Sequence, residues 1–357
     1  MERKINFNPG PAALPDEVKE EFALAVRAYK NTGLSILELP HRSTAFTDII
    51  EESKTLVREL CALNDDYEIV WLQGGGRLQF CMVPMNFLPD GSTAAYIDTG
   101  HWAHEAAEYA AYYGKCTIAA TSASVQYSKL PQWPMTLPDN TAYLHITTNN
   151  TIYGTQWHNL PEVNTHLIAD MSSDILSGKR DCTQYAMFYA AAQKNLGIAG
   201  VALAVIRKDL LEKTARQVPP MLSYQHQVKQ NSVVNTANVA GVYAALLMLR
   251  WTKQKGLDNI AAENNLKAKA LYAAIDKSKV FNARVTEATH RSLMNVCFTA
   301  ESPEAEDAFM QLCARQSIVG IEGHRVTRGF RVSLYNAIPL SSVETLVGLM
   351  QEFESSL

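Results

Sequence analysis

The sequence predicts an α/β protein with a mostly parallel central sheet and a smaller α+β domain. Through most of the chain, short apolar runs of β-type residues alternate with helical patterns, as in sheets whose strands are buried on both faces. From about residue 258 the order changes to helix, strand, helix, strand, helix. We expect residues 16–257 to form a large domain, and residues 1–15 with 258–357 to form a small one.

Length and composition set the broad class. The 357 residues suffice for about two domains, and 47% hydrophobic with 19% charged residues is ordinary for a globular protein. A net charge of -4 gives no basic footprint for nucleic acid. Six scattered cysteines without a CxxC pair or a Cys/His cluster indicate a reducing cytoplasm and no metal site. We expect no signal peptide, because residues 1–15 carry charges and then prolines with no apolar region, and no membrane span, because the longest apolar run near a helix covers only 239–249.

The expected strands and helices follow in order. The large-domain strands are 67–73, 94–98, 116–121, 142–148, 165–170, 187–192 and 201–206. Helical patterns cover 43–60, 77–88, 102–114 and 236–254. The short turn QKNLGIAG joins the last two strands, so we expect this pair to be antiparallel within the parallel sheet. The small domain has helices at 261–278, 303–316 and 341–357, and strands at 291–300 and 329–336.

Ligands of open α/β sheets bind beyond the carboxyl ends of the strands, so the residues there are candidates. Gly74–Gly76 and Arg77 follow a strand and open a helix, which suits either a phosphate or a plain tight turn. Asp170 ends a strand and either caps the next segment or pairs with a cationic ring nitrogen. Trp102 is either a core residue or a platform for an aromatic ring.

Lys194 stands in the apolar stretch 189–206, where a lysine is unusual. It is either a solvated turn residue or an amine that burial keeps neutral for chemistry. Four features follow strands of one expected sheet: a possible phosphate-binding glycine turn, an aromatic side chain that could support a ring, a carboxylate, and a lysine that can be desolvated. Together these features are what a pyridoxal-phosphate site requires, which favours the catalytic interpretation.

Two His-Arg dipeptides come from distant parts of the chain. His41–Arg42 precedes a helix, and His324–Arg325 lies in a glycine-rich turn. Either both dipeptides lie in solvated loops, or they come together in the fold to bind a dianion. Arg331, alone among apolar strand residues, needs a partner, and a substrate carboxylate would serve.

Several long motifs in the same order are similar to those of the phosphoserine aminotransferases, a family of class V aminotransferases with the pyridoxal-phosphate fold type I. The motifs that carry the resemblance are HRS (41–43), QGGGRLQF (73–80), MVPMN (82–86), DTGHW (98–102), NNTIYGTQ (149–156), ADMSSDILS (169–177), AAAQKNLGIAG (190–200) and the late GHR and FRVSLYNA. The resemblance runs from residue 6 to residue 340 and so covers essentially the whole chain.

The resemblance implies a role for each matching residue. Lys194 corresponds to the Schiff-base lysine, Asp170 to the partner of the ring nitrogen, and Trp102 to the stacking residue. Phosphate binders and the residue that bonds the ring hydroxyl are implied as well: Gly76, Arg77 and Gln193, with Thr151 for the hydroxyl. Asn235 and Thr236 correspond to residues that reach the cofactor phosphate of a neighbouring subunit, which implies a homodimer with its site at the interface. His41, Arg42, His324 and Arg325 correspond to binders of the substrate phosphate or side-chain carboxylate, and Arg331 to the binder of the α-carboxylate.

The implied reaction moves an amino group between L-glutamate and 3-phosphohydroxypyruvate, giving 2-oxoglutarate and O-phospho-L-serine. The resemblance leaves open 4-phosphohydroxy-L-threonine as a second substrate. This chain has NTANVAG at 235–241 where the family commonly has NTPPT, so the turn after Thr236 is expected to differ. Rival readings are an alanine-glyoxylate type aminotransferase, a cysteine desulfurase-like lyase, and a nucleotide-binding protein. The last is disfavoured because the glycine run lacks the GKS or GxGxxG pattern.

Overall fold

A computed structural model of the protein describes residues 4–132, 136–160 and 162–357. Residues 1–3 of the expected small domain, and residues 133–135 and 161 of the expected large one, lie outside these ranges. Within them, one sheet of seven strands organises most of the chain: β2 (Tyr67–Gln73), β3 (Thr93–Asp98), β4 (Lys115–Thr121), β5 (Thr141–Thr147), β6 (His166–Asp170), β7 (Met187–Ala191) and β8 (Val201–Arg207).

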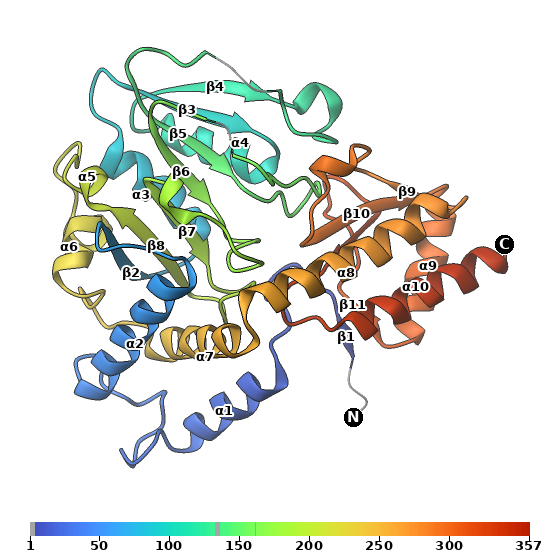
Figure 1. The fold of residues 1–357 in the computed structure, drawn as a ribbon, viewed down its shortest axis with the longest axis horizontal. Coiled ribbons are helices and arrows are strands. Elements are labelled where there is room, and N and C mark those ends of the chain that lie inside the picture. The colour runs from blue at the N-terminus through green and yellow to red at the C-terminus, as the bar shows by residue number, and fades with distance from the viewer. Residues whose placement is uncertain (1–3, 133–135, 161) are drawn as a thin grey trace.

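The strands lie in the order β2-β8-β7-β6-β5-β3-β4 (Figure 1). Neighbours from β7 through β4 run parallel, whereas β8 is antiparallel to both β7 and β2. The mostly parallel sheet with one antiparallel strand is therefore confirmed. The turn that carries Lys194 joins β7 and β8, and it lies at the same edge as the carboxyl end of β6.

Alternate residues of each strand pack into separate cores on the two faces of the sheet. Ile69 and Trp71 contribute to one core, and Val70 and Leu72 to the other. One face is covered by α1 (Asp16–Arg27), α2 (Thr44–Leu60) and α7 (Val239–Lys255). The opposite face carries α3 (Gly76–Phe87), α4 (His101–Ala110), α5 (Lys208–Leu211) and α6 (Tyr224–Lys229). Both faces are buried, which explains the continuous apolar runs in the sequence.

A separate apolar cluster lies in the C-terminal part of the chain, to the right of the sheet in Figure 1. It combines Phe7 with residues from Ala268 to Phe353. The elements here are α8 (Leu257–Lys277), β9 (Phe281–Ala283), β10 (Asn295–Ala300), α9 (Pro303–Arg315), β12 (Phe330–Ser333) and α10 (Leu340–Ser355). β1 (Ile5–Asn6) pairs in parallel with β11 (Ile318–Val319). We propose that these residues form the expected small domain, and this separate core supports the proposal.

Some expected boundaries were wrong. The strand expected at 291–300 begins only at Asn295, because the Ser292 hydroxyl accepts the backbone N–H groups of Met294 and Asn295. The strand expected at 329–336 ends at Ser333, because the following backbone turns toward Lys267. The helix expected from 236 begins at Val239. The Asn238 side chain accepts the N–H of Gly241 and so caps this helix.

Helix α1 was not expected from the sequence, and α8 begins four residues before the expected position, at Leu257. Among the residues that the structure describes, no helix has both the length and the apolar character needed to cross a bilayer.

Candidate active site

A cavity of about 400 Å³ opens at the carboxyl ends of β6 and β7, between the sheet and the small domain. Most of the expected site residues meet there. Its described lining is Pro9, Gly10, Gly75, Gly76, Arg77, Phe80, Trp102, Thr151, Asp170, Ser172, Ala191, Gln193, Lys194, His324 and Arg331.

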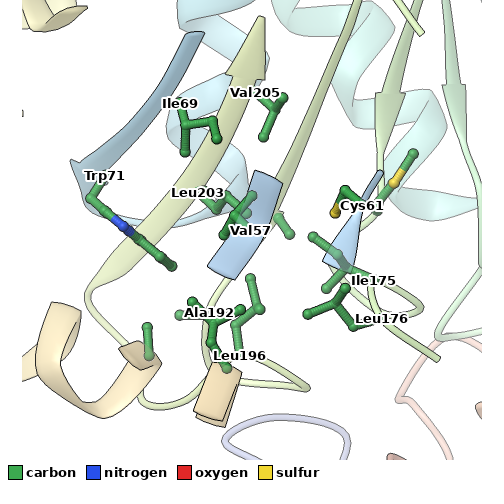
Figure 2. Close-up of a cluster of buried hydrophobic side chains, with 14 of the residues drawn as sticks. Val57, Cys61, Ile69, Trp71, Ile175, Leu176, Ala192, Leu196, Leu203 and Val205 are labelled. Atoms are coloured by element: carbon green, nitrogen blue, oxygen red, sulfur yellow. The ribbon is translucent and has the colours of Figure 1, made fainter. Parts of the chain in front are cut away.

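Lys194 projects from the β7–β8 turn into this cavity, where its Nζ donates a hydrogen bond to the Thr151 hydroxyl at 2.9 Å. Burial lowers the pKa of Lys194 to about 8, and the nearby Asp170 charge only partly opposes that shift. The neutral amine, which is the nucleophilic form, is therefore far more populated near neutral pH than it is for an exposed lysine, although the ammonium still predominates at pH 7. On either side of the turn, Ala192 and Leu196 pack into the apolar core, as Figure 2 shows.

Asp170 ends β6 and is buried, with one carboxylate oxygen accepting the backbone N–H of Ser172 at 2.8 Å. The carboxylate thus holds the local turn and also lines the cavity. No helix begins at this point, so the bond is a turn contact and not a helix cap. Burial raises the pKa of the Asp170 carboxyl, and the Ser172 bonds and the Lys194 charge oppose this.

The glycine run lies where α3 begins, with Gly75 as its N-cap and no side chain capping the helix. The first N–H groups of α3 are therefore free to bind an anion in the cavity. A Cβ on Gly76 would lie 3.4 Å from the Ser172 hydroxyl, so the glycine keeps this end of the cavity open. Arg77 lies 4.9 Å above the Trp102 ring and pairs with Glu105 at 3.1 Å.

Arg331 and His324 reach the cavity from the C-terminal part of the chain. Arg331 is 8% exposed, its Nε has no hydrogen-bond partner, and the described residues include no acidic partner for it. Burial lowers the pKa of its guanidinium. Burial, Arg331 and His101 also lower the pKa of His324. An unpaired buried guanidinium facing a cavity is a site for a carboxylate ligand.

The remaining expected residues lie outside the cavity of the single chain. Arg325 is exposed beside His324, and of the two dipeptides only His324 lines the cavity. His41 and Arg42 lie in the turn before α2. Asn235 and Thr236 lie at the end of β2, where the Gln73 amide donates to the Asn235 side chain at 2.9 Å and to the Thr236 carbonyl at 2.5 Å.

Four side chains of the lining were missed from the sequence: Pro9, Phe80, Ser172 and Ala191. The Ser172 hydroxyl accepts the backbone N–H of Ala191 at 3.0 Å and so joins the Asp170 turn to β7. The sequence signal that could have identified Ser172 is its position two residues after Asp170, which ends a strand. Phe80 and Ala191 had none, because apolar residues at these positions look like core.

The lining matches pyridoxal phosphate group by group. An amine lowered in pKa suits its aldehyde, the free N–H groups of α3 suit its phosphate, and the buried carboxylate suits its protonated ring nitrogen. Lys194 and Arg331 bring two cationic groups to the cavity against the one carboxylate of Asp170, and an anionic cofactor and substrate would balance them.

A cavity of this kind, at the strand ends of this sheet, is that of the pyridoxal-phosphate-dependent enzymes of fold type I. A family model described as "Aminotransferase class-V" matches residues 5–346. The chain belongs to the class V aminotransferases and, within them, to the phosphoserine aminotransferase family.

Similar proteins cover the whole chain. A phosphoserine aminotransferase of Bacillus cereus is 42% identical over 357 residues, covering 99% of both chains, and one of Phocaeicola vulgatus is 42% identical over 355 residues, with the same coverage. The solved phosphoserine aminotransferase from Bacillus circulans subsp. alkalophilus has a TM-score of 0.97 at 40% identity, covering 100% of this chain and 99% of that one. A pyridoxal-phosphate-bound phosphoserine aminotransferase from Trichomonas vaginalis has a TM-score of 0.93 at 31% identity, covering 98% and 100%.

Proposed function

We propose that the protein transfers the amino group of L-glutamate to 3-phosphohydroxypyruvate, giving 2-oxoglutarate and O-phospho-L-serine, with pyridoxal phosphate as its cofactor. The observation that carries this proposal is the cavity in which Lys194, Asp170 and Arg331 face one another. Full-length similarity to phosphoserine aminotransferases supports the substrate pair. A lyase that uses a mobile cysteine is not favoured, because none of the six cysteines is among the described residues that line this cavity.

Each residue of the cavity has a proposed task. Lys194, Asp170, Trp102 and the N-terminus of α3 would hold the cofactor, which when bound supplies an electron sink for the substrate carbanion. Arg77, Gln193 and Thr151 would complete its binding. Arg331 binds the α-carboxylate, and Lys194 Nζ takes the proton from the substrate Cα. Because its pKa is lowered, His324 is largely neutral at pH 7, and a phosphate dianion would draw a proton to it.

We propose that the working enzyme is a homodimer with each site at the subunit interface. The support is that four expected binders, His41, Arg42, Asn235 and Thr236, lie away from the cavity of their own chain. A second copy could bring them to it. Arg325, exposed beside His324, would then be able to meet Arg42 around a substrate phosphate.

The proposed location is the cytoplasm. All six cysteines are free thiols, among them Cys61 and Cys182, whose side chains are in contact without being joined. A reducing compartment keeps such a pair reduced.

The reaction itself tests the proposal. Purified protein loaded with pyridoxal phosphate should form 2-oxoglutarate from L-glutamate and 3-phosphohydroxypyruvate. Pyruvate and glyoxylate serve as matched acceptors that lack the phosphate. Equal or better turnover with glyoxylate would contradict the proposed substrate and favour an alanine-glyoxylate type activity.

A further inference from the structure

Two buried asparagines join the turn that carries Lys194 to the turn that follows Arg331. Asn195, next to Lys194, accepts the backbone N–H of Asn336 on its side-chain oxygen at 3.1 Å. Its amide donates to the Ile175 carbonyl at 3.0 Å. Both asparagines are 2% exposed, so water cannot replace these bonds.

The Asn336 side chain extends the connection to α8. Its amide donates to the Leu176 carbonyl at 2.8 Å, and its oxygen accepts from the Asn264 amide at 2.9 Å. Asn264 also donates to the Ser177 carbonyl at 2.9 Å. The segment 175–177, which continues from the Asp170 turn, is therefore joined to the C-terminal part of the chain by two hydrogen bonds, from Asn336 and Asn264, and to the Lys194 turn by a third, from Asn195.

Lys267 holds the same turn from the other side. Its side chain is fully buried, and its Nζ donates to the carbonyls of Leu334, Tyr335 and Ile338 at 2.8, 2.9 and 3.0 Å. The three donors of an ammonium match these three acceptors. A shift of the 334–338 turn would leave several polar groups buried without partners, which is costly.

From these contacts we propose that Asn195 and Asn336 are positioning residues that fix the separation between Lys194 and Arg331. An amino acid held by its α-carboxylate at Arg331 then presents its Cα to Lys194 Nζ. The inference rests on the proposed function. Apolar packing of Ala192 and Leu196 holds the Lys194 turn to the sheet (Figure 2), whereas Asn195 ties that turn to the small domain.

The test compares Asn195→Ala and Asn336→Ala with Asn86→Ala. Asn86 is also buried and makes three comparable hydrogen bonds, but its partners, Met82, Leu222 and Tyr224, lie in neither the Lys194 turn nor the 334–338 turn. In fully loaded enzyme we expect kcat of the first two variants to fall about 10- to 100-fold, with a raised KM for the amino acid. The pH midpoint of their visible cofactor absorbance should also shift. Asn86→Ala should lose stability but keep kcat and midpoint near wild type.

A second measurement needs no cofactor. Amide hydrogen exchange in the cofactor-free protein should speed up over 190–200 and 334–338 in Asn336→Ala, but not in Asn86→Ala. If Asn336→Ala does not fold, Asn264→Ala, which removes one bond of Asn336, should give a smaller change in the same direction.

The inference would be overturned if Asn195→Ala, which removes the side-chain oxygen that accepts the Asn336 N–H, and Asn336→Ala both behaved like Asn86→Ala in every readout. Failure of the proposed function looks different, since wild-type protein would then gain no visible absorbance with pyridoxal phosphate.

Discussion

The amine of Lys194 lies 2.9 Å from the hydroxyl of Thr151, to which it donates a hydrogen bond. Thr151 belongs to the segment after β5, and Lys194 to the turn after β7, so the bond spans two strand ends of the sheet. It holds the amine within the cavity that both residues line. Removing the hydroxyl should therefore loosen the amine without unfolding the chain.

Thr151→Ala should shift the pH midpoint of the visible cofactor absorbance and lower kcat by about tenfold, since one such bond is worth about 1 kcal/mol or more. Thr151→Ser, which keeps the hydroxyl, is the control and should stay near wild type. A spectrophotometric titration with steady-state rates checks both. Equal behaviour of the alanine and serine variants would mean that the hydroxyl has no role.

The pH dependence of cofactor capture follows from the pKa of Lys194. Burial lowers that pKa to about 8, and only the neutral amine attacks the aldehyde. The capture rate of cofactor-free protein should rise with pH up to about 8 and then level off. Asp170→Asn removes a charge that stabilises the ammonium, so its midpoint should move to lower pH. Stopped-flow absorbance measures both, and a rate still rising at about pH 10 would show an unperturbed lysine.

The arginines should separate into two functional groups. Arg331→Ala should raise KM for every amino donor, because all donors carry the α-carboxylate. Arg42→Ala and Arg325→Ala should weaken O-phospho-L-serine by about 1.5–3 kcal/mol, the scale of a charge-assisted bond, with little effect on alanine. Steady-state kinetics with both donors provide the comparison. Equal losses for both donors in Arg42→Ala would place that residue outside the phosphate site.

Gly197 explains how the Lys194 turn fits beneath α7. Its φ is +144°, and an added Cβ would lie 3.2 Å from the Ala245 nitrogen. Gly197→Ala should therefore destabilise the protein by about 1–3 kcal/mol. Gly348, in α10 with nothing within 4 Å, is the matched control, where alanine should stabilise by up to about 1 kcal/mol. Thermal unfolding of both variants tests this, and a neutral Gly197→Ala would show that the turn can adjust.

The sequence predicted the sheet well, because each buried strand is a continuous apolar run. The strand-end rule then located Asp170, Lys194 and the glycine turn without further information. It could not locate the contacts of Asn195 with Asn336, since 141 residues separate them and neither belongs to a periodic pattern. Burial alone would not have identified the lysine that lines the cavity, because Lys267 is more deeply buried than Lys194.

His41 and Arg42 show a second limit of the sequence. Their dipeptide has the same two residue types as His324–Arg325, but this likeness does not predict how far apart the two dipeptides lie in the folded chain. In the single chain they lie in the turn before α2, outside the cavity that His324 lines. Their proposed approach to the cavity of a second subunit depends on the shape of the subunit interface, which a sequence motif does not encode.

The most direct test of the account is to find the lysine that holds the cofactor. Burial lowers the pKa of three lysines, that of Lys194 to about 8, that of Lys267 to about 7, and that of Lys54 as well. Only Lys194 is among the described residues that line the cavity, whereas Lys267 is bound to three backbone carbonyls. Loaded protein should be reduced with borohydride, digested and analysed by mass spectrometry. The account predicts the cofactor on the peptide that contains Lys194, and attachment at Lys267, or at no lysine, would contradict it.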